Sequence, residues 1–209
     1  MRVKIRSTSA LTADATGIAA SQTFTINVPL TLTGGAASLS PPRRLSFDAT
    51  ASIAAVIFTI VGRDRNGAPI TETVTGVTTT PVSTQYIYAS VTSITPSATD
   101  GVNQVFVGWT AEVISAPLML DHYRNPFNVG LGVVVTGTVS YSIQHTFEDL
   151  QVTGTVDGAG TWFDHEFLAA QSANGDGNYA FAVEAIRLVQ LSGTGSVTMK
   201  VMQSGLRGA

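Results

Sequence analysis

Residues 128–147 read NVGLGVVVTGTVSYSIQHTF and carry the clearest pattern in the chain. From Val133 onward most alternate residues are apolar or aromatic, and the residues between them are mostly Thr and Ser. A period of two is typical of β-strands with one buried face, and no helical period fits it. Gly137 marks either a hairpin turn between two paired strands or a bend in a single strand. In both cases the apolar face must pack against another sheet.

The composition excludes several classes of protein. Hydrophobic residues make up 44% of the 209 residues and charged residues only 12%, about half of the usual ~25%. No apolar run approaches the ~20 residues of a membrane helix, so we expect no membrane partner. The formal net charge of -3 provides no basic field for nucleic acid. Because the chain has no cysteine, disulfides and cysteine-ligated metals are excluded.

Short segments with the same alternation recur along the chain, and turn signals separate them. Val56, Phe58 and Ile60 lie in a segment that is apolar on both faces, which predicts a central strand. Asp64–Gly67 predicts a hairpin, because Asn-Gly readily adopts positive φ angles, whereas the small and polar Leu11–Ser21 predicts a loop. Further strands are expected at Phe24–Val28, Ile70–Val77, Tyr86–Ile94, Gln104–Trp109, Val183–Leu191 and Val197–Gln203. We expect the last two strands to form a hairpin. The spacing predicts an all-β fold with sandwich or jelly-roll-like sheets.

The length favours two domains, since domains commonly hold about 100–150 residues. We place an N-terminal β-domain at residues 1–116 and a C-terminal β-sandwich domain at 117–209. Pro117 and Pro126 flank LMLDHYRN, which reads as a short linker strand between them. The first six residues alternate apolar and basic side chains and predict a short strand or an extended arm that pairs with another subunit.

Each of the three histidines lies near carboxylates in the sequence. The groups are His122 with Asp121, His145 with Glu148 and Asp149, and His165 with Asp164 and Glu166. Zinc binds such ligands, but the groups fall on different predicted elements without a ligand-type spacing. His145 continues the apolar face of its strand, which favours a hydrogen-bonded core or interface residue. We therefore predict no metal site.

The segment after the central stretch gives weaker signals. Trp162–Ala170 fits either a helical turn or a strand, and Gln171–Asn178 reads as a loop. NGDGN at 174–178 places oxygen side chains at alternate positions, as calcium loops do, but Ala185 stands where the bidentate acid would fall. A Gly-rich turn between strands is favoured, and calcium binding is left open.

No constellation in the sequence indicates an enzyme. A Gly-x-Ser-x-Gly elbow is missing, and neighbouring acids are too common to identify a glycosidase. We predict no catalytic residue and no cofactor. Several aromatic residues fit either a sugar-binding face or, more commonly, cores and interfaces. They are Trp109, Trp162, Tyr86, Tyr88 and Tyr123.

Two parts of the chain resemble structural proteins of tailed-bacteriophage virions. The first part contains PRRLSFDATASIAAVIFTIVGRDRNGAPITETVTG, YIYASVTSITPS and VFVGW. The second contains NPFNVGLGVVVTGTVSYSIQHTFEDL and WFDHEFLAAQSANGDGNYAFAVEAIRLVQLSGTGSVTMKVMQ. The likeness spans about residues 43–110 and 126–203 and consists of a Thr- and Gly-rich β pattern.

The resemblance implies a non-enzymatic capsid decoration or cement protein on the outer surface of the head. Its expected partners are the major capsid protein, which it binds between capsomers, and further copies of itself. A homotrimer is the expected oligomer, because shells offer local threefold positions. The N-terminal arm and the linker are the expected contact segments. Their candidate interaction residues are Arg2, Lys4, Arg6, Asp121, His122, Tyr123 and Arg124.

The alternative is a tail or adsorption-apparatus protein that binds a host glycan or receptor. Such a protein would expose aromatic side chains in loops, with Trp162, Tyr123 and Tyr179 as candidates. A phage-encoded depolymerase is a third class, but the spacing of the acids does not favour it.

Overall fold

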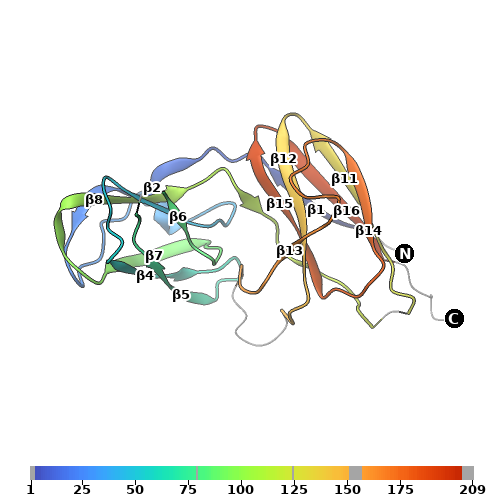
Figure 1. Ribbon diagram of the computed structural model, residues 1–209, viewed down its shortest axis with the longest axis horizontal. Coiled ribbons are helices and arrows are strands. Elements are labelled where there is room, and N and C mark those ends of the chain that lie inside the picture. Colours follow the sequence, from blue (N-terminus) through green and yellow to red (C-terminus); the bar gives the residue numbers. More distant parts are fainter. Residues whose placement is uncertain (1–2, 79, 124, 151–156, 204–209) are drawn as a thin grey trace. The chain divides into compact units, whose positions relative to one another are not determined.

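The computed structural model describes residues 3–78, 80–123, 125–150 and 157–203 (Figure 1). Over these ranges the fold is all-β, as predicted, with one short 3-10 turn at Gly34–Ala37 (η1) and no α-helix. The described part of the chain also contains no helix that is long and apolar enough to span a membrane.

Contacts between Cα atoms divide the chain into two compact units. The N-terminal unit comprises the described residues of Thr12–Thr110 and Val156–Ala159. The C-terminal unit comprises those of Met1–Leu11, Ala111–Thr155 and Gly160–Ala209. This division differs from the expected boundary after residue 116, and it places the first strand of the chain with the second half.

The N-terminal unit contains two antiparallel sheets around one core. The first sheet has the order β2 (Asp14–Phe24), β8 (Asp100–Trp109), β3 (Ser46–Ala49) and β6 (Val82–Ser83). The second has the order β5 (Pro69–Thr75), β4 (Ile57–Arg63) and β7 (Ser90–Pro96). The β4–β5 pair confirms the hairpin predicted from Asp64–Gly67, with φ of 82° at Gly67. In the core, the Phe58 ring lies 5.5 Å from that of Phe24 and 5.6 Å from that of Phe47.

The C-terminal unit also contains two antiparallel sheets. One has the order β1 (Lys4–Ser9), β16 (Ser196–Gln203), β11 (Val129–Thr136) and β14 (Gly175–Tyr179). The other has the order β10 (Leu118–Met119), β15 (Ala185–Gly193), β12 (Val139–Thr146) and β13 (Phe163–Asp164), with β9 (Val113–Ile114) also paired to β15. Apolar residues from both sheets form one buried cluster, including Leu131, Met199, Ile143 and Leu188. The unit is therefore sandwich-like.

The central stretch forms two strands that are not paired with each other. β11 and β12 lie in different sheets, and Gly137, with φ of 79°, begins the short connection between them. β15 and β16 also lie in different sheets, so the hairpin predicted for residues 183–203 is wrong. The two connections support each other, since the Thr138 carbonyl accepts hydrogen bonds from the N–H groups of Thr194 (2.9 Å) and Gly195 (3.0 Å). Crossing between sheets turns the apolar faces of both strands toward one core.

Three other predictions require correction. The segment Leu11–Ser21, predicted to be a loop, forms most of β2. The strand predicted at Phe24–Val28 is not formed, because β2 ends at Phe24, and Ile26 and Val28 beyond it are about half exposed. The segment Gln171–Asn178, also predicted to be a loop, contributes most of β14. Small residues gave no alternation in these places, and backbone pairing with neighbouring strands determines the structure there.

Candidate interaction surface

The predicted N-terminal arm is a strand of its own chain. β1 pairs with β16 along its whole length, from Lys4 opposite Val201 to Ser9 opposite Ser196, and Figure 1 shows the two side by side. The Lys4 ammonium donates a hydrogen bond to the Met119 carbonyl at 3.2 Å. Arg6 Nε donates one to the Ala116 carbonyl at 3.0 Å. Of the two predicted alternatives, a short strand is confirmed for Lys4–Ser9, and pairing of this segment with another subunit stays a prediction. Arg2 lies outside the described residues.

Removal of residues 1–9 is expected to destabilise the C-terminal unit by about 2–4 kcal/mol, since each lost backbone hydrogen bond contributes about 1 kcal/mol. Urea unfolding followed by Trp162 fluorescence in a Trp109→Phe background measures this. Ile5→Ala, which removes an exposed side chain but keeps the ladder, is the control. Unchanged stability of the truncated chain would show that β1 contributes nothing to the fold.

The predicted linker is also part of the C-terminal unit. β9 and β10 both pair with β15, and Leu118 and Leu120 are buried. The backbone N–H of Asp121 donates to Gln203 Oε1 at 3.0 Å, and Gln203 Nε2 donates to the Asp121 carbonyl at 2.7 Å. The segment therefore forms a wall of the sandwich rather than a linker. Arg124 lies outside the described residues.

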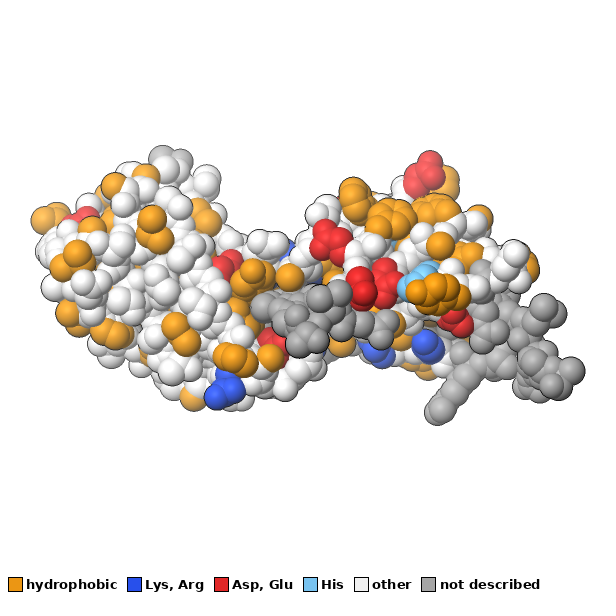
Figure 2. All heavy atoms as spheres, turned by 90° about the horizontal axis from the view of Figure 1, so that it is seen from below, with side chains coloured by type: hydrophobic (Ala, Val, Ile, Leu, Met, Phe, Trp, Pro, Cys, Tyr) orange, Lys and Arg blue, Asp and Glu red, His pale blue; other side chains and the backbone are white. Residues whose placement is uncertain are grey.

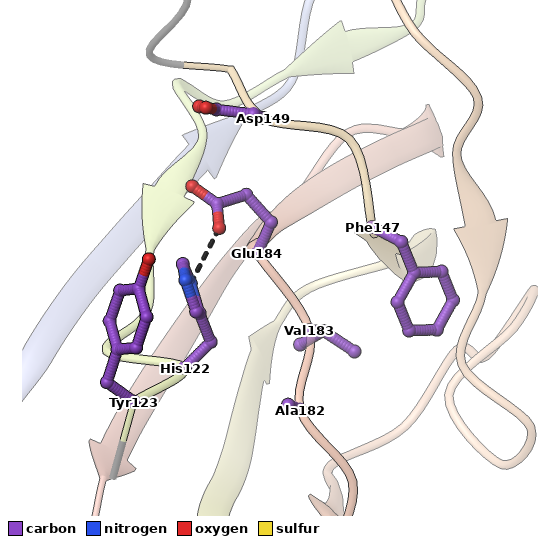
Figure 3. Close-up of a pocket in the computed structure, with 7 residues that line it drawn as sticks. All are labelled: His122, Tyr123, Phe147, Asp149, Ala182, Val183 and Glu184. Carbon is purple, nitrogen blue, oxygen red and sulfur yellow. Dashed lines mark ion pairs between the residues drawn. The ribbon is translucent and has the colours of Figure 1, made fainter.

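The end of this segment forms one side of a surface hollow of about 540 Å³, called here the first hollow. Figure 3 shows its lining: His122, Tyr123, Phe147, Asp149, Ala182, Val183 and Glu184. The imidazole of His122 points toward Glu184, with Nδ1 2.7 Å from Oε2. His122 Nδ1 has no hydrogen-bond partner among the described residues, so its contact with Glu184 is an ion pair when His122 is protonated. Tyr123 is 88% exposed, and its ring lies 4.1 Å from that of His122.

Next to the first hollow, three half-exposed phenylalanines surround His145. Phe147, Phe163 and Phe181, called here the aromatic cluster, are 56%, 47% and 52% exposed. Their ring centroids lie 5.4, 5.8 and 5.9 Å from that of His145. Phe147 directly follows β12, Phe163 lies in β13, and Phe181 lies in the segment before β15. Exposed apolar side chains gathered in this way are typical of contact surfaces for other molecules.

His145 is the buried residue against which the aromatic cluster packs. It is buried, and its Nδ1 lies 3.1 Å from the hydroxyl of Tyr179, which is itself 1% exposed. The prediction of a hydrogen-bonded core or interface histidine is confirmed, whereas Tyr179 is not the exposed aromatic residue expected for glycan binding. Burial lowers the pKa of His145, and His165 lowers it further, while Asp164 opposes the shift.

The lowered pKa of His145 predicts that acid destabilises the C-terminal unit. Between the folded-state pKa and the ordinary value of about 6.5, the unfolded chain binds the proton and the folded chain does not. The contribution of His145 is therefore present above pH 6.5 and is lost as the pH falls below it. Urea unfolding measured from pH 8 to pH 4 should show this loss, and His145→Gln should weaken the dependence. The same pH dependence in both proteins would contradict the assignment.

A smaller hollow of about 190 Å³, called here the second hollow, shares Phe181 with the aromatic cluster. Its lining residues are His145, Asp164, His165, Glu166, Phe167, Asn178, Tyr179 and Phe181. The turn His165–Leu168 forms one wall of this hollow. The buried ring of His165 lies against Gly177 of β14, where a side chain would not fit, because a Cβ at this glycine would be 2.8 Å from His165 Cε1. On the C-terminal unit, at the right of Figure 2, acidic side chains lie close to hydrophobic ones and to a histidine.

The sequence did not single out the aromatic cluster. A usable signal was present, since a phenylalanine stands within two residues of His145 and of His165. Trp162, an expected glycan-binding residue, is half-buried, and the guanidinium of Arg187 lies 4.0 Å from its ring centroid.

No group of three or more His, Cys, Asp or Glu side chains is placed to hold a metal ion within the described residues. NGDGN lies in β14 and just before it, and Asn174 Oδ1 accepts a hydrogen bond from the Val135 N–H at 2.8 Å. Comparisons with protein-family models, with curated proteins and with solved structures give no match.

Proposed function

We propose that this chain is a non-enzymatic structural protein of a tailed-bacteriophage virion. It decorates the outer surface of the head, binds the major capsid protein between capsomers and stabilises the shell. It acts there as a homo-oligomer, and the local threefold positions of a shell favour a trimer. We also propose that its sheets have a jelly-roll-like arrangement.

The aromatic cluster is the observation that carries this proposal. Three contacting phenylalanines, each about half exposed, lie on β-strands or next to them. Aromatic side chains on a rigid support are the residues that dominate protein–protein interfaces. The low proportion of charged residues and the resemblance of both halves to virion proteins support the same conclusion.

A cement protein stabilises a shell because its contacts must be broken before neighbouring capsomers separate. Phage heads that lack this chain are therefore expected to release their DNA at a lower temperature than complete heads, and purified protein should restore the difference. Heads of equal stability with and without the chain would overturn the proposal.

The second candidate is a tail or adsorption protein that binds a host glycan. Tyr123 favours it, because its ring is almost fully exposed beside the carboxylates of the first hollow, and sugars stack on such rings. Adsorption that depends on Tyr123, tested with Tyr123→Ala phage, supports this candidate. Unchanged adsorption together with a glycan array without hits excludes it.

A further inference from the structure

The second hollow has a rigid wall built around a turn. The Leu168 N–H donates to the His165 carbonyl at 3.2 Å, and the Phe167 N–H donates to His165 Nδ1 at 3.1 Å. The His165 N–H in turn donates to the Ile143 carbonyl of β12 at 2.8 Å. Glu166 and Phe167 thus stand at the tip of a turn that is fixed before any partner arrives, which reduces the entropy lost on binding. Phe167 is 68% exposed, so core packing does not explain its presence.

The charge of the second hollow is negative. Asp164 and Glu166 are exposed carboxylates, and Gln144 Nε2 holds Asp164 Oδ1 at 2.9 Å. His165 Nδ1 accepts a hydrogen bond from the Phe167 N–H, and Nε2 lies 3.3 Å from the Asn178 carbonyl. The described residues that line the hollow include no Lys or Arg. Asp164 and Glu166 therefore line the hollow without a Lys or Arg among its described lining residues, and the Gln144 side chain that binds Asp164 also accepts a hydrogen bond from Arg187 Nε at 2.8 Å.

We propose that the second hollow binds an arginine side chain presented by a partner protein. The guanidinium would stack on the exposed face of Phe167 or Phe181 and donate to Asp164 and Glu166. Arginine fits better than lysine, because its planar group can stack and form paired hydrogen bonds at the same time. The inference rests on the proposed function in one respect: the partner that presents the arginine is a protein.

The size of the hollow favours a single side chain over a small-molecule ligand. Its volume of about 190 Å³ is below the ~300–1,000 Å³ of ordinary ligand pockets. The aromatic cluster shares Phe181 with the hollow, so apolar residues next to the arginine in the partner would lie on that cluster. Charge complementarity and apolar contact thus occur on one surface.

The test uses the purified full-length chain, labelled with ¹⁵N, and the peptide acetyl-Gly-Arg-Gly-amide. We expect the amide signals of residues 164–167 and 178–181 to shift, with a dissociation constant on the order of millimolar. Glu166→Gln should weaken binding about tenfold and Phe167→Ala about threefold. The matched controls Asp176→Asn and Met202→Ala, also exposed on the C-terminal unit, should leave the affinity unchanged.

The same peptide with citrulline in place of arginine keeps the shape and removes the charge. Equal shifts from the two peptides, or no shift from the arginine peptide, would overturn the inference. The measurement needs no virion, so its outcome is separate from that of the proposed function. If the chain binds the arginine peptide but is absent from phage heads, the arginine site is supported and the proposed function is wrong. If the chain decorates heads but does not bind the arginine peptide, the proposed function is supported and the arginine site is wrong.

Discussion

On the proposed function, replacing Phe147, Phe163 and Phe181 together by alanine is expected to lower the affinity of the chain for phage heads at least about 100-fold. Aromatic anchors at the centre of an interface commonly contribute about 2 kcal/mol or more each, and these three rings are half exposed in the isolated chain. The same exposure means that their removal costs little folding free energy. Sedimentation of the purified variant with heads that lack the chain measures the change.

The matched control for this variant lies in the N-terminal unit. Ile26, Ile57 and Val102 are 48%, 46% and 85% exposed, and replacing all three by alanine removes a comparable exposed apolar surface. This control should bind heads as the natural chain does. Equal binding by both triple variants would show that the aromatic cluster is not the contact surface.

Phe58→Ala is expected to destabilise the N-terminal unit by about 3–5 kcal/mol. Phe58 is fully buried in β4 between the rings of Phe24 and Phe47. Alanine would leave a cavity that rigid strands on both sides cannot close, and the lost transfer free energy adds to the cost of that cavity. For a unit of this size such a loss lowers the melting temperature by more than about 10 °C.

The two tryptophans of the chain allow this effect to be assigned to a unit. Trp109 packs against the core that contains Phe58, and Trp162 belongs to the C-terminal unit. In a Trp162→Phe background, thermal unfolding followed by fluorescence reports the unit that contains Phe58. Ile57→Ala, at the neighbouring half-exposed position, should change the transition by only a few degrees. A loss below about 1 kcal/mol for Phe58→Ala would contradict the packing described here.

Local patterns predicted the strands better than their partners. Asn66-Gly67 located the β4–β5 hairpin, because the turn itself requires positive φ. Gly137 gave an equally clear break, but the alternation on either side is the same whether the next strand pairs with the first or crosses to the opposite sheet. That choice depends on β14, β15 and β16, which follow later in the chain.

The candidate surface was only partly predictable for a related reason. His145 could be placed in the interior because it continues the apolar face of its own strand. The aromatic cluster could not be predicted, because its three residues come from separate segments of the chain. These segments come together only when β12, β13 and β15 pair. The pairing of β1 with β16 could not be predicted either, because the sequence of an edge strand does not show which edge it covers.

Location in the virion tests the central claim most directly. Electron microscopy of phage particles with a tagged chain, together with fractionation of heads and tails, shows where the protein lies. We expect label over the outer surface of the heads and the protein in the head fraction. Label confined to tails, or to neither part, would contradict it.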